Sequence, residues 1–324
     1  MEAYIGIDVG SVTTKLAVLD KDEELVAYNY LLTQGKPIDM VQQGLVQIKE
    51  QLPEDVDICG VATTGSARYL AGVITGADLV KNEITSHAVA TLHYFPEAQT
   101  IIEIGGQDSK IIIIRDGVVT DFGMNTVCAA GTGSFLDHQA LRLNMSIEEF
   151  SQQAINSQTP VRIAGRCTVF AESDMIHKQQ MGHRIEDILY GLCQALVRNY
   201  LNNVGLGKDI KPPIVFQGGV AFNQAIVKAL EEELDTEIIV PPHHEVMGAI
   251  GAALLVHEEL ASYNKRSQFK GFGVSEVKYH TSSFECKACP NLCEIAQLSL
   301  NGQVLARWGG RCDLWERMLT EEAK

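Results

Sequence analysis

The stretch YIGIDVGSVTTKLAVLD, residues 4–20, decides the fold because TIIEIGGQDSKIIIIRDG, residues 100–117, repeats its pattern. In each stretch an apolar strand ends near an acid, and a glycine, a lysine and a second apolar strand follow at the same spacing. Each is predicted to form a β-hairpin with a polar turn, where glycine lets the backbone approach a ligand closely. The matching positions, all offset by 95 residues, are Asp8 with Glu103, Gly10 with Gly105, and Lys15 with Lys110.

One such hairpin is most simply a structural turn, but two in matching register indicate paired phosphate loops on opposite walls of a cleft. A third glycine turn, in PPIVFQGGVAFN (212–223), follows a strand and precedes an amphipathic helix. The segment HHEVMGAIGAALLVHEEL (243–260) has the small residues of a helix packed closely against backbone. We reject a metal site at its adjacent His243 and His244, because neighbouring histidines seldom converge on one ion.

The bulk composition excludes several classes of protein. The 324 residues are 46% hydrophobic and 21% charged, which indicates a globular chain rather than a disordered one. The net charge of −15 disfavours nucleic acid or an anionic membrane surface as the main partner. Without a signal peptide or an apolar run long enough to span a bilayer, we expect a cytoplasmic protein. Its eight cysteines then favour metal ligands, redox thiols or core residues over disulfides.

Two cysteines stand beside loop-like sequence, Cys128 in NTVCAAGTGSFLD and Cys167 in CTVFAESD. The Gly131–Gly133 run after Cys128 has the character of a phosphate-handling loop. A helix-like stretch follows each cysteine, and the positive potential at a helix N-terminus favours a thiolate, as does the neighbouring Arg166.

Thiolates are the ligands of soft metals and iron–sulfur clusters. A 4Fe–4S cluster usually takes four cysteines, so this pair predicts a two-fold dimer in which each chain donates Cys128 and Cys167. In contrast, Cys59 and Cys193 lie on apolar faces and are interpreted as core residues.

The glycine turns resemble those of the superfamily of acetate and sugar kinases, heat-shock chaperones and actin, in which two duplicated α/β lobes clamp ATP. The resemblance implies that Asp8 and Asp108 act around Mg²⁺ and its waters, since Mg²⁺ prefers oxygen ligands. It also implies two phosphate loops, the first formed by Gly10, Ser11, Thr13, Thr14 and Lys15, and the second by Gly105, Gly106 and Gln107. The adenosine would lie beside Gly218, Gly219 and Gly248. The expected fold is therefore an α/β, duplicated, two-lobed actin-like ATPase with a small cysteine-rich C-terminal extension.

Within that superfamily, GIDVGSVTTK, IGGQDSK, NTVCAAGTGSFLD, CTVFAESD and GGVAFN together resemble the ATP-dependent activators of 2-hydroxyacyl-CoA dehydratases. These activators belong to the BadF/BadG/BcrA/BcrD family, which includes subunits of benzoyl-CoA reductase. The resemblance covers about residues 4–260. It implies a homodimer with one bridging 4Fe–4S cluster and one ATP per chain. A ferredoxin or flavodoxin would reduce the cluster. ATP hydrolysis would then drive one low-potential electron to a partner iron–sulfur enzyme. Gln107 is a candidate to orient the attacking water, and Asp8 to act through Mg²⁺ or as a base.

The composition changes after about residue 263, where a polar linker precedes CKACPNLCEIAQLSLNGQVLARWGGRC (286–312). Cys286, Cys289, Cys293 and Cys312 predict a four-thiolate site, which the sequence leaves open to Zn²⁺ or a second iron–sulfur cluster. Their intervening sequence predicts a β-hairpin on an Asn-Gly turn. The tail resembles segments of longer, multi-domain activators, where docking a partner or relaying electrons are its two candidate roles.

The expected division of the chain is a first lobe over residues 1–97 and 246–264, a second lobe over 98–245 that carries the cluster cysteines, and a tail over 265–324. Two other functions stay open on this fold. A sugar or carboxylate kinase has no use for Cys128 and Cys167 and would be colourless when purified without oxygen. An ATP-gated scaffold protein with a structural zinc tail would contain zinc but no iron.

Overall fold

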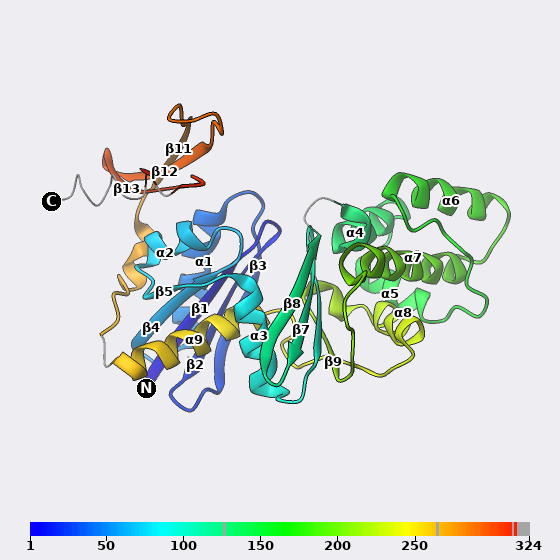
Figure 1. The fold of residues 1–324 in the computed structure, drawn as a ribbon, viewed down its shortest axis with the longest axis horizontal. Coiled ribbons are helices and arrows are strands. Elements are labelled where there is room, and N and C mark those ends of the chain that lie inside the picture. The colour runs from blue at the N-terminus through cyan, green and yellow to red at the C-terminus, as the bar shows by residue number, and fades with distance from the viewer. Residues whose placement is uncertain (126–127, 264–265, 313, 316–324) are drawn as a thin grey trace. The chain divides into compact units, whose positions relative to one another are not determined.

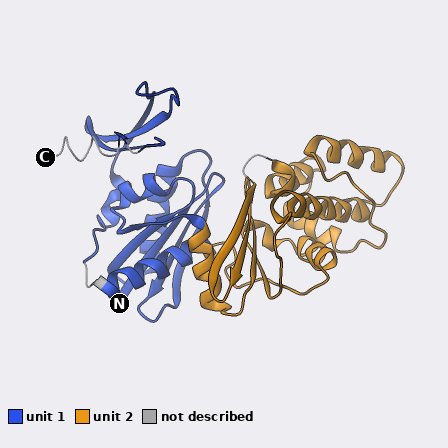
Figure 2. Cartoon of the chain, in the orientation of Figure 1, with its two compact units in different colours: residues 1–83, 248–324 blue, residues 84–247 orange. Residues whose placement is uncertain are grey.

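The computed structural model describes residues 1–125, 128–263, 266–312 and 314–315, in two compact units. Unit 1 comprises residues 1–83 and 248–324, and unit 2 comprises residues 84–247 (Figure 2). The tail thus groups with unit 1 in the structure. The expected division into two lobes and a separate tail stays a prediction, and its boundary at residues 264 and 265 lies outside the described residues.

Unit 1 is built on a five-stranded sheet in the order β3-β2-β1-β4-β5 (Figure 1). Its strands are β1 (Glu2–Val9), β2 (Thr13–Asp20), β3 (Leu25–Leu32), β4 (Asp57–Thr64) and β5 (Leu79–Val80). Its helices are α1 (Pro37–Gln51), α2 (Arg68–Thr75) and α9 (Met247–Tyr263). The tail adds the short helix η4 (Phe272–Glu276) and the strands β11 (His280–Glu285), β12 (Glu294–Leu300) and β13 (Gln303–Trp308).

Unit 2 has its own five-stranded sheet in the order β10-β9-β6-β7-β8. Its strands are β6 (Thr100–Ile104), β7 (Ser109–Arg115), β8 (Val118–Asn125), β9 (Ile214–Gln217) and β10 (Ile238–Ile239). Its helices are α3 (Glu83–Tyr94), α4 (Gly133–Arg142), α5 (Ile147–Ala154), α6 (Thr168–Gln180), α7 (Ile185–Tyr200) and α8 (Gln224–Leu234). The short turns η1 (Ala129–Gly131), η2 (Leu201–Gly205) and η3 (Gly219–Phe222) complete it.

The two sheets repeat one topology. In each, the first two strands form an antiparallel hairpin, a third antiparallel strand lies on one edge, and two parallel strands lie on the other side. The hairpins also share their register, because Asp8 pairs with Lys15 and Glu103 pairs with Lys110. The duplicated two-lobed fold expected from the sequence repeat is therefore confirmed.

Helices cover both faces of each sheet, which explains the nearly continuous apolar strands. In β1, Ile5 and Ile7 join the core beneath α1 and α2, whereas Tyr4 packs with residues of α9 on the opposite face. Gly6 lies under α9 so closely that a Cβ there would fall 1.8 Å from the backbone oxygen of Ala249. The prediction that the small residues of this helix pack against backbone is confirmed.

In unit 2 the same alternation divides the isoleucines of β6 and β7 between two cores. Ile102 and Ile111 face the large core formed by α4, α5, α7 and α8, and Ile101 and Ile112 face α3. Because side chains alternate along a strand, each strand serves both cores at once.

Local sequence signals mark several helix ends. Pro37 occupies the first turn of α1, and Ser146 with Glu149 forms a reciprocal capping box on α5. The side chain of Asn223 caps α8, and Gly76 ends α2 in the left-handed conformation with φ of +71°. Among the described residues, no helix has the length and apolar character required to cross a membrane.

The tail is anchored on unit 1 by polar contacts. Gln42 of α1 donates from Nε2 to the carbonyl oxygens of Val274 and Val277, both at 2.7 Å. Asp78 accepts a hydrogen bond from the Ser267 hydroxyl at 2.7 Å. These contacts hold the residues before β11 against α1 and the residue before β5 of unit 1.

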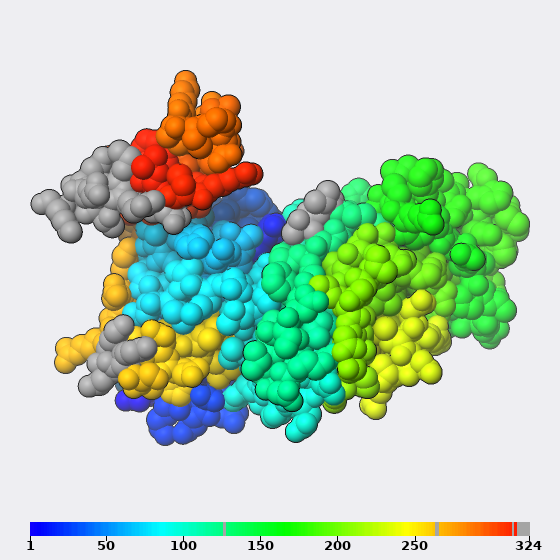
Figure 3. Space-filling model, in the orientation of Figure 1, coloured from blue at the N-terminus to red at the C-terminus, as the bar shows by residue number. Residues whose placement is uncertain are grey.

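Apolar contacts continue the anchoring into the tail sheet, whose order is β11-β12-β13. Leu298 is fully buried and belongs to the unit 1 core, and Trp308 packs against that core. Figure 3 shows the red end of the tail lying over the cyan surface that contains α2. The predicted hairpin is also confirmed, since Asn301 and Gly302 both have positive φ between β12 and β13.

Candidate functional site

The β1–β2 turn of unit 1 holds a buried acid against a lysine. Asp8 is 4% exposed, and its Oδ2 lies 2.9 Å from the Lys15 Nζ. The turn closes through a hydrogen bond from the Gly10 amide to the Thr13 carbonyl at 2.9 Å. The hydroxyl of Thr33, the residue directly after β3, donates to the Gly10 carbonyl at 3.0 Å and fixes this part of the turn. Of the other predicted residues, Ser11 is exposed and Thr14 is buried.

The β6–β7 turn of unit 2 repeats this arrangement. The Lys110 Nζ lies 2.8 Å from Glu103 Oε2 and 3.0 Å from Asp108 Oδ1, and Lys110 is 2% exposed. The Gly105 amide donates to the Asp108 carbonyl at 3.0 Å, as Gly10 does to Thr13. Gln107 is exposed at the tip of the turn, with Gly105 and Gly106 half-buried beside it.

A buried tyrosine supports this second turn from below. The Tyr200 hydroxyl donates to the Lys110 carbonyl at 2.8 Å. Burial raises the pKa of Tyr200 well above its usual range, so the hydroxyl stays protonated and keeps this hydrogen bond.

A glycine with positive φ ends the neighbouring parallel strand in both units. Gly218 follows β9 with φ of +94°, and a Cβ there would lie 2.9 Å from Glu103 Oε1. Gly65 follows β4 with φ of +87°, and a Cβ there would lie 2.5 Å from Asp8 Oδ1. Gly218 was predicted from the sequence, whereas Gly65 was not. The detectable signal was the order in TTGSAR (63–68), which mirrors FQGGVA (216–221) after a strand.

His244 has a structural role that the sequence did not indicate. It is 9% exposed, and its Nδ1 donates to the Gly218 carbonyl at 3.0 Å. The Gly218 amide in turn donates to the His244 carbonyl at 2.9 Å, and the Phe222 ring stacks edge-on against the imidazole. His244 therefore fixes the turn in which Gly219 begins η3. The remaining predicted glycine, Gly248, lies in the first turn of α9 in unit 1.

The start of α4 is hydrogen-bonded directly to the β6–β7 turn. The Gly133 amide donates to the Gly105 carbonyl, and the Ser134 amide donates to the Gly106 carbonyl, both at 2.8 Å. The Ser134 hydroxyl also donates to the Gly106 carbonyl. These contacts give Gly133 a packing role, and Gly131 is likewise buried against Asn199. Phosphate binding by Gly131 and Gly133 stays a prediction.

Cys128 lies at the start of this same segment. It is half-buried and precedes the short turn η1, whereas α4 itself begins only at residue 133. Asn125, at the end of β8, accepts from the Cys128 amide at 2.9 Å and donates to the Cys128 carbonyl at 2.7 Å. The cysteine backbone is therefore fixed by one side chain.

Cys167 is the N-cap residue of α6 and is also half-buried. The segment that leads to Cys167 is fixed by Asn199 of α7, which is 5% exposed and donates to the Gly165 carbonyl at 2.5 Å. Because Gly131 packs against the same Asn199 side chain, this residue contacts the chain near both cysteines. Sequence reasoning missed Asn199, which carries no motif in the middle of an amphipathic helix.

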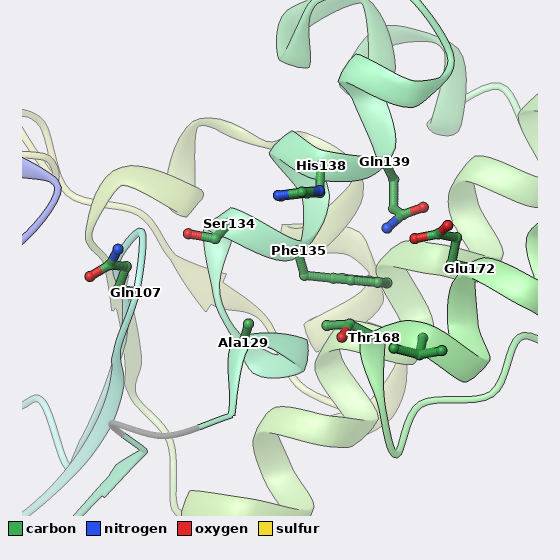
Figure 4. A pocket seen from close by; sticks show the side chains of 9 residues that line it. Gln107, Ala129, Ser134, Phe135, His138, Gln139, Thr168 and Glu172 are labelled. Atoms are coloured by element: carbon green, nitrogen blue, oxygen red, sulfur yellow. The ribbon is translucent and has the colours of Figure 1, made fainter. Parts of the chain in front are cut away.

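A pocket of about 600 Å³ lies between α4 and α6 (Figure 4). Ala129 and Thr168, the residues directly after the two cysteines, both line it, together with Gln107, Ser134, Phe135, His138, Gln139, Val169 and Glu172. An ion pair of 2.5 Å between Arg142 and Glu172 joins the two helices. The structure thus brings the surroundings of both predicted cluster cysteines, and Gln107, to one pocket of unit 2.

The two cysteines interpreted as core residues differ in their burial. Cys193 is fully buried in the unit 2 core, as predicted, and burial raises the pKa of its thiol. Cys59 on β4 is only half-buried and packs against the edge of the core beside α9, and this partial burial raises the pKa of its thiol. In the part of the chain that the structure describes, no three His, Cys, Asp or Glu side chains are gathered tightly enough to hold a metal ion.

Two units with the same sheet order, each with an acid–glycine–lysine hairpin, define a duplicated ATPase of the actin-like fold. The chain belongs to the BadF/BadG/BcrA/BcrD ATPase family, whose model matches residues 5–256.

Its relatives include the (R)-2-hydroxyglutaryl-CoA dehydratase activating ATPase of Acidaminococcus fermentans, 35% identical over 79% of this chain and 98% of that protein. The crystal structure of component A of the (R)-2-hydroxyglutaryl-CoA dehydratase of A. fermentans matches with a TM-score of 0.75 and 33% identity, over 81% of this chain and all of that one. The activator of the 2-hydroxyisocaproyl-CoA dehydratase from Clostridium difficile, solved with bound ADPNP, matches with a TM-score of 0.72 and 34% identity. That match covers 81% of this chain and 97% of the activator. The family match stops before the tail.

Proposed function

We propose that this chain is an ATP-dependent activator that forms a homodimer, holds one 4Fe–4S cluster and delivers a low-potential electron to a partner iron–sulfur enzyme. The partner belongs to the 2-hydroxyacyl-CoA dehydratases or related reductases, since the relatives are named activators of such dehydratases. A ferredoxin or flavodoxin is the proposed electron donor.

The observation that carries the proposal is the direct link between a phosphate-type turn and the cysteine segment. Gly105 and Gly106 accept hydrogen bonds from the first residues of α4, five residues beyond Cys128. Any movement of the turn on binding or hydrolysis of ATP is therefore passed to the segment that begins at Cys128. A kinase that phosphorylates a small substrate has no need for this link.

The two thiols fit half of a cluster site. Cys128 and Cys167 are half-buried, and their immediate neighbours line one pocket. Thiolates are the donors that a 4Fe–4S cluster requires, and two chains related by a two-fold axis would supply all four. When bound, such a cluster supplies a one-electron carrier whose potential depends on burial, charge and hydrogen bonds.

The nucleotide residues follow from the two hairpin turns. We assign the backbone of Gly10–Lys15 and of Gly105–Gln107 to the ATP phosphates, and the carboxylates of Asp8 and Asp108 to Mg²⁺ and its waters. Gln107 is exposed and has room to orient an attacking water. A bound ADPNP in a relative of 34% identity supports the assignment of ATP as the nucleotide.

The test is an oxygen-free preparation of the full chain, analysed for iron, acid-labile sulfide and mass in solution. We expect a brown dimer, and we expect Cys128→Ser and Cys167→Ser each to lose its iron. Cys59→Ser is the matched control, because it makes the same substitution at a half-buried cysteine outside the pocket. The electron paramagnetic resonance spectrum of the protein reduced with dithionite should change when ATP and Mg²⁺ are added. Iron content that is unaffected by Cys128→Ser and Cys167→Ser would refute the proposal.

A further inference from the structure

The strand register of the tail places two of its four cysteines opposite each other. Glu285 at the end of β11 pairs with Glu294 at the start of β12, so Cys286 and Cys293 are the next pair. The Cys286 amide donates to the Cys293 carbonyl at 2.8 Å, which extends the ladder by one pair. Cys289 lies in the six-residue loop that this pair closes.

The third strand brings Cys312 to the same end of the sheet. Ala296 pairs with Trp308 at the end of β13, and the chain then continues along β12 toward its start. Gly309 has φ of +101°, and a Cβ there would lie 2.7 Å from the carbonyl oxygen of Glu294. The chain therefore passes directly beside the residue that follows Cys293, and Cys312 comes three residues later.

The four cysteines differ in exposure in a way that suits a site closed by its ligand. Cys286 is buried and Cys293 half-buried, which fixes two positions, whereas Cys289 and Cys312 are exposed on loops. The described side chains are not gathered around one point, so the two exposed thiols have to turn inward. Metal sites of this type commonly form together with their ion.

The tail sheet also lacks a core of its own at this end. Between residues 280 and 308, the buried apolar side chains are Cys286, Ile295 and Leu298, and Leu298 belongs to the core of unit 1. A three-stranded sheet with so few buried side chains gains stability from a metal, as small domains often do.

We propose that Cys286, Cys289, Cys293 and Cys312 bind one Zn²⁺ as a four-thiolate site that fixes the cysteine end of this sheet. Four thiols each lose a proton to solvent as the metal binds, and no electron is transferred. A closed set of four cysteines is the donor set of structural zinc sites, and the C-x2-C spacing is typical of them. The anchoring of the tail on α1 through Gln42 also suits a structural role.

The experiment measures zinc in the full chain produced in zinc-supplemented medium and washed with a weak chelator. We expect close to one zinc per chain in the wild type and in the matched control Cys59→Ser. We expect about a tenfold loss in Cys293→Ser and in the exposed-position variant Cys289→Ser, which leaves the buried thiols in place. Cys128→Ser should keep its zinc while it loses iron, so the outcome is independent of the proposed electron-transfer function.

A second measurement needs no variant and therefore does not depend on the folding of one. Co²⁺ replaces zinc in the metal-free wild-type chain, and four thiolates around Co²⁺ give intense tetrahedral absorption bands in the visible range. The proposal is overturned if the wild type contains no zinc and shows no such bands, or if both tail variants retain zinc. Iron and sulfide lost together in the tail variants would also overturn it, because the site would then hold an iron–sulfur cluster.

Discussion

Replacing Gly65 by alanine tests whether this residue, absent from the sequence-based site, fixes the buried acid of unit 1. Its φ is +87°, and a new Cβ would lie 2.5 Å from Asp8 Oδ1 and 2.6 Å from the Val9 carbonyl oxygen. Neither atom belongs to a long flexible side chain. The substitution therefore adds backbone strain and a steric clash at one position.

The two contributions can be separated with a control from the same unit. Gly35 has φ of +69°, and a Cβ there meets nothing within 4 Å, so Gly35→Ala introduces backbone strain alone. A non-glycine residue at positive φ costs about 1–2 kcal/mol. Overpacking a close contact adds about 1–3 kcal/mol, so Gly65→Ala should cost about 2–5 kcal/mol in total.

The measurement is urea unfolding of both variants, followed by far-ultraviolet circular dichroism, together with ATP binding by titration calorimetry. Gly65→Ala should be less stable than Gly35→Ala by about 1–3 kcal/mol, and its ATP affinity should fall because Asp8 is displaced. Equal stability of the two variants would show that the turn relaxes freely around the new methyl group. The structural argument for Gly65 would then be wrong.

Three further predictions concern the buried charges and the exposed glutamine. Lys110→Ala leaves Glu103 buried without its partner at 2.8 Å and should destabilise the protein by about 3–5 kcal/mol; the more exposed counterpart Lys15→Ala should cost less in the same unfolding assay, and the reverse order would contradict the burial argument. Hydrogen bonds, led by that from the Thr159 amide, lower the pKa of Asp187 to about 2. This value is below the ~3.9 of an unfolded chain, so the stabilisation is present above about pH 4 and is lost as the pH falls toward 2. Asp187→Asn should lose less stability over that pH range than the wild type. Unfolding curves at several pH values check this, and a free energy of unfolding that falls with pH as steeply in the variant as in the wild type would contradict it. Finally, Gln107→Ala should lower the ATP hydrolysis rate by at least about tenfold with nucleotide affinity retained; an unchanged rate would remove Gln107 from the reaction.

Comparison of the two hairpins shows which parts of the site could be predicted from the sequence. The acids, glycines and lysines repeat at one spacing. In a β-hairpin, the number of residues between two positions determines whether they lie opposite each other on the two strands. The pairing of Asp8 with Lys15, and of Glu103 with Lys110, could therefore be inferred before the fold was known.

The segments around the two cysteines and the turn at Gly218 were recognised for the same local reason, but the side chains that support them were not. Asn199 contacts residues 34 and 68 positions earlier in the chain, near the two cysteines, and His244 contacts Gly218, which is 26 positions earlier. Neither role could be predicted from the local sequence, because each depends on a neighbour that only the packing of α7 or of the strand-end turns supplies.

The sequence by itself therefore determined the duplicated α/β architecture, the register of both hairpins and the Asn-Gly turn of the tail. These features follow from contacts between residues close together in the chain, where side-chain period and turn chemistry are sufficient. The tertiary structure alone decided that Gly65 lies against Asp8, that Ser134 holds the Gly105–Gly106 turn, and that the tail packs on unit 1. Such contacts join distant segments, and their geometry is fixed only when the order of the strands and the packing of the helices are fixed.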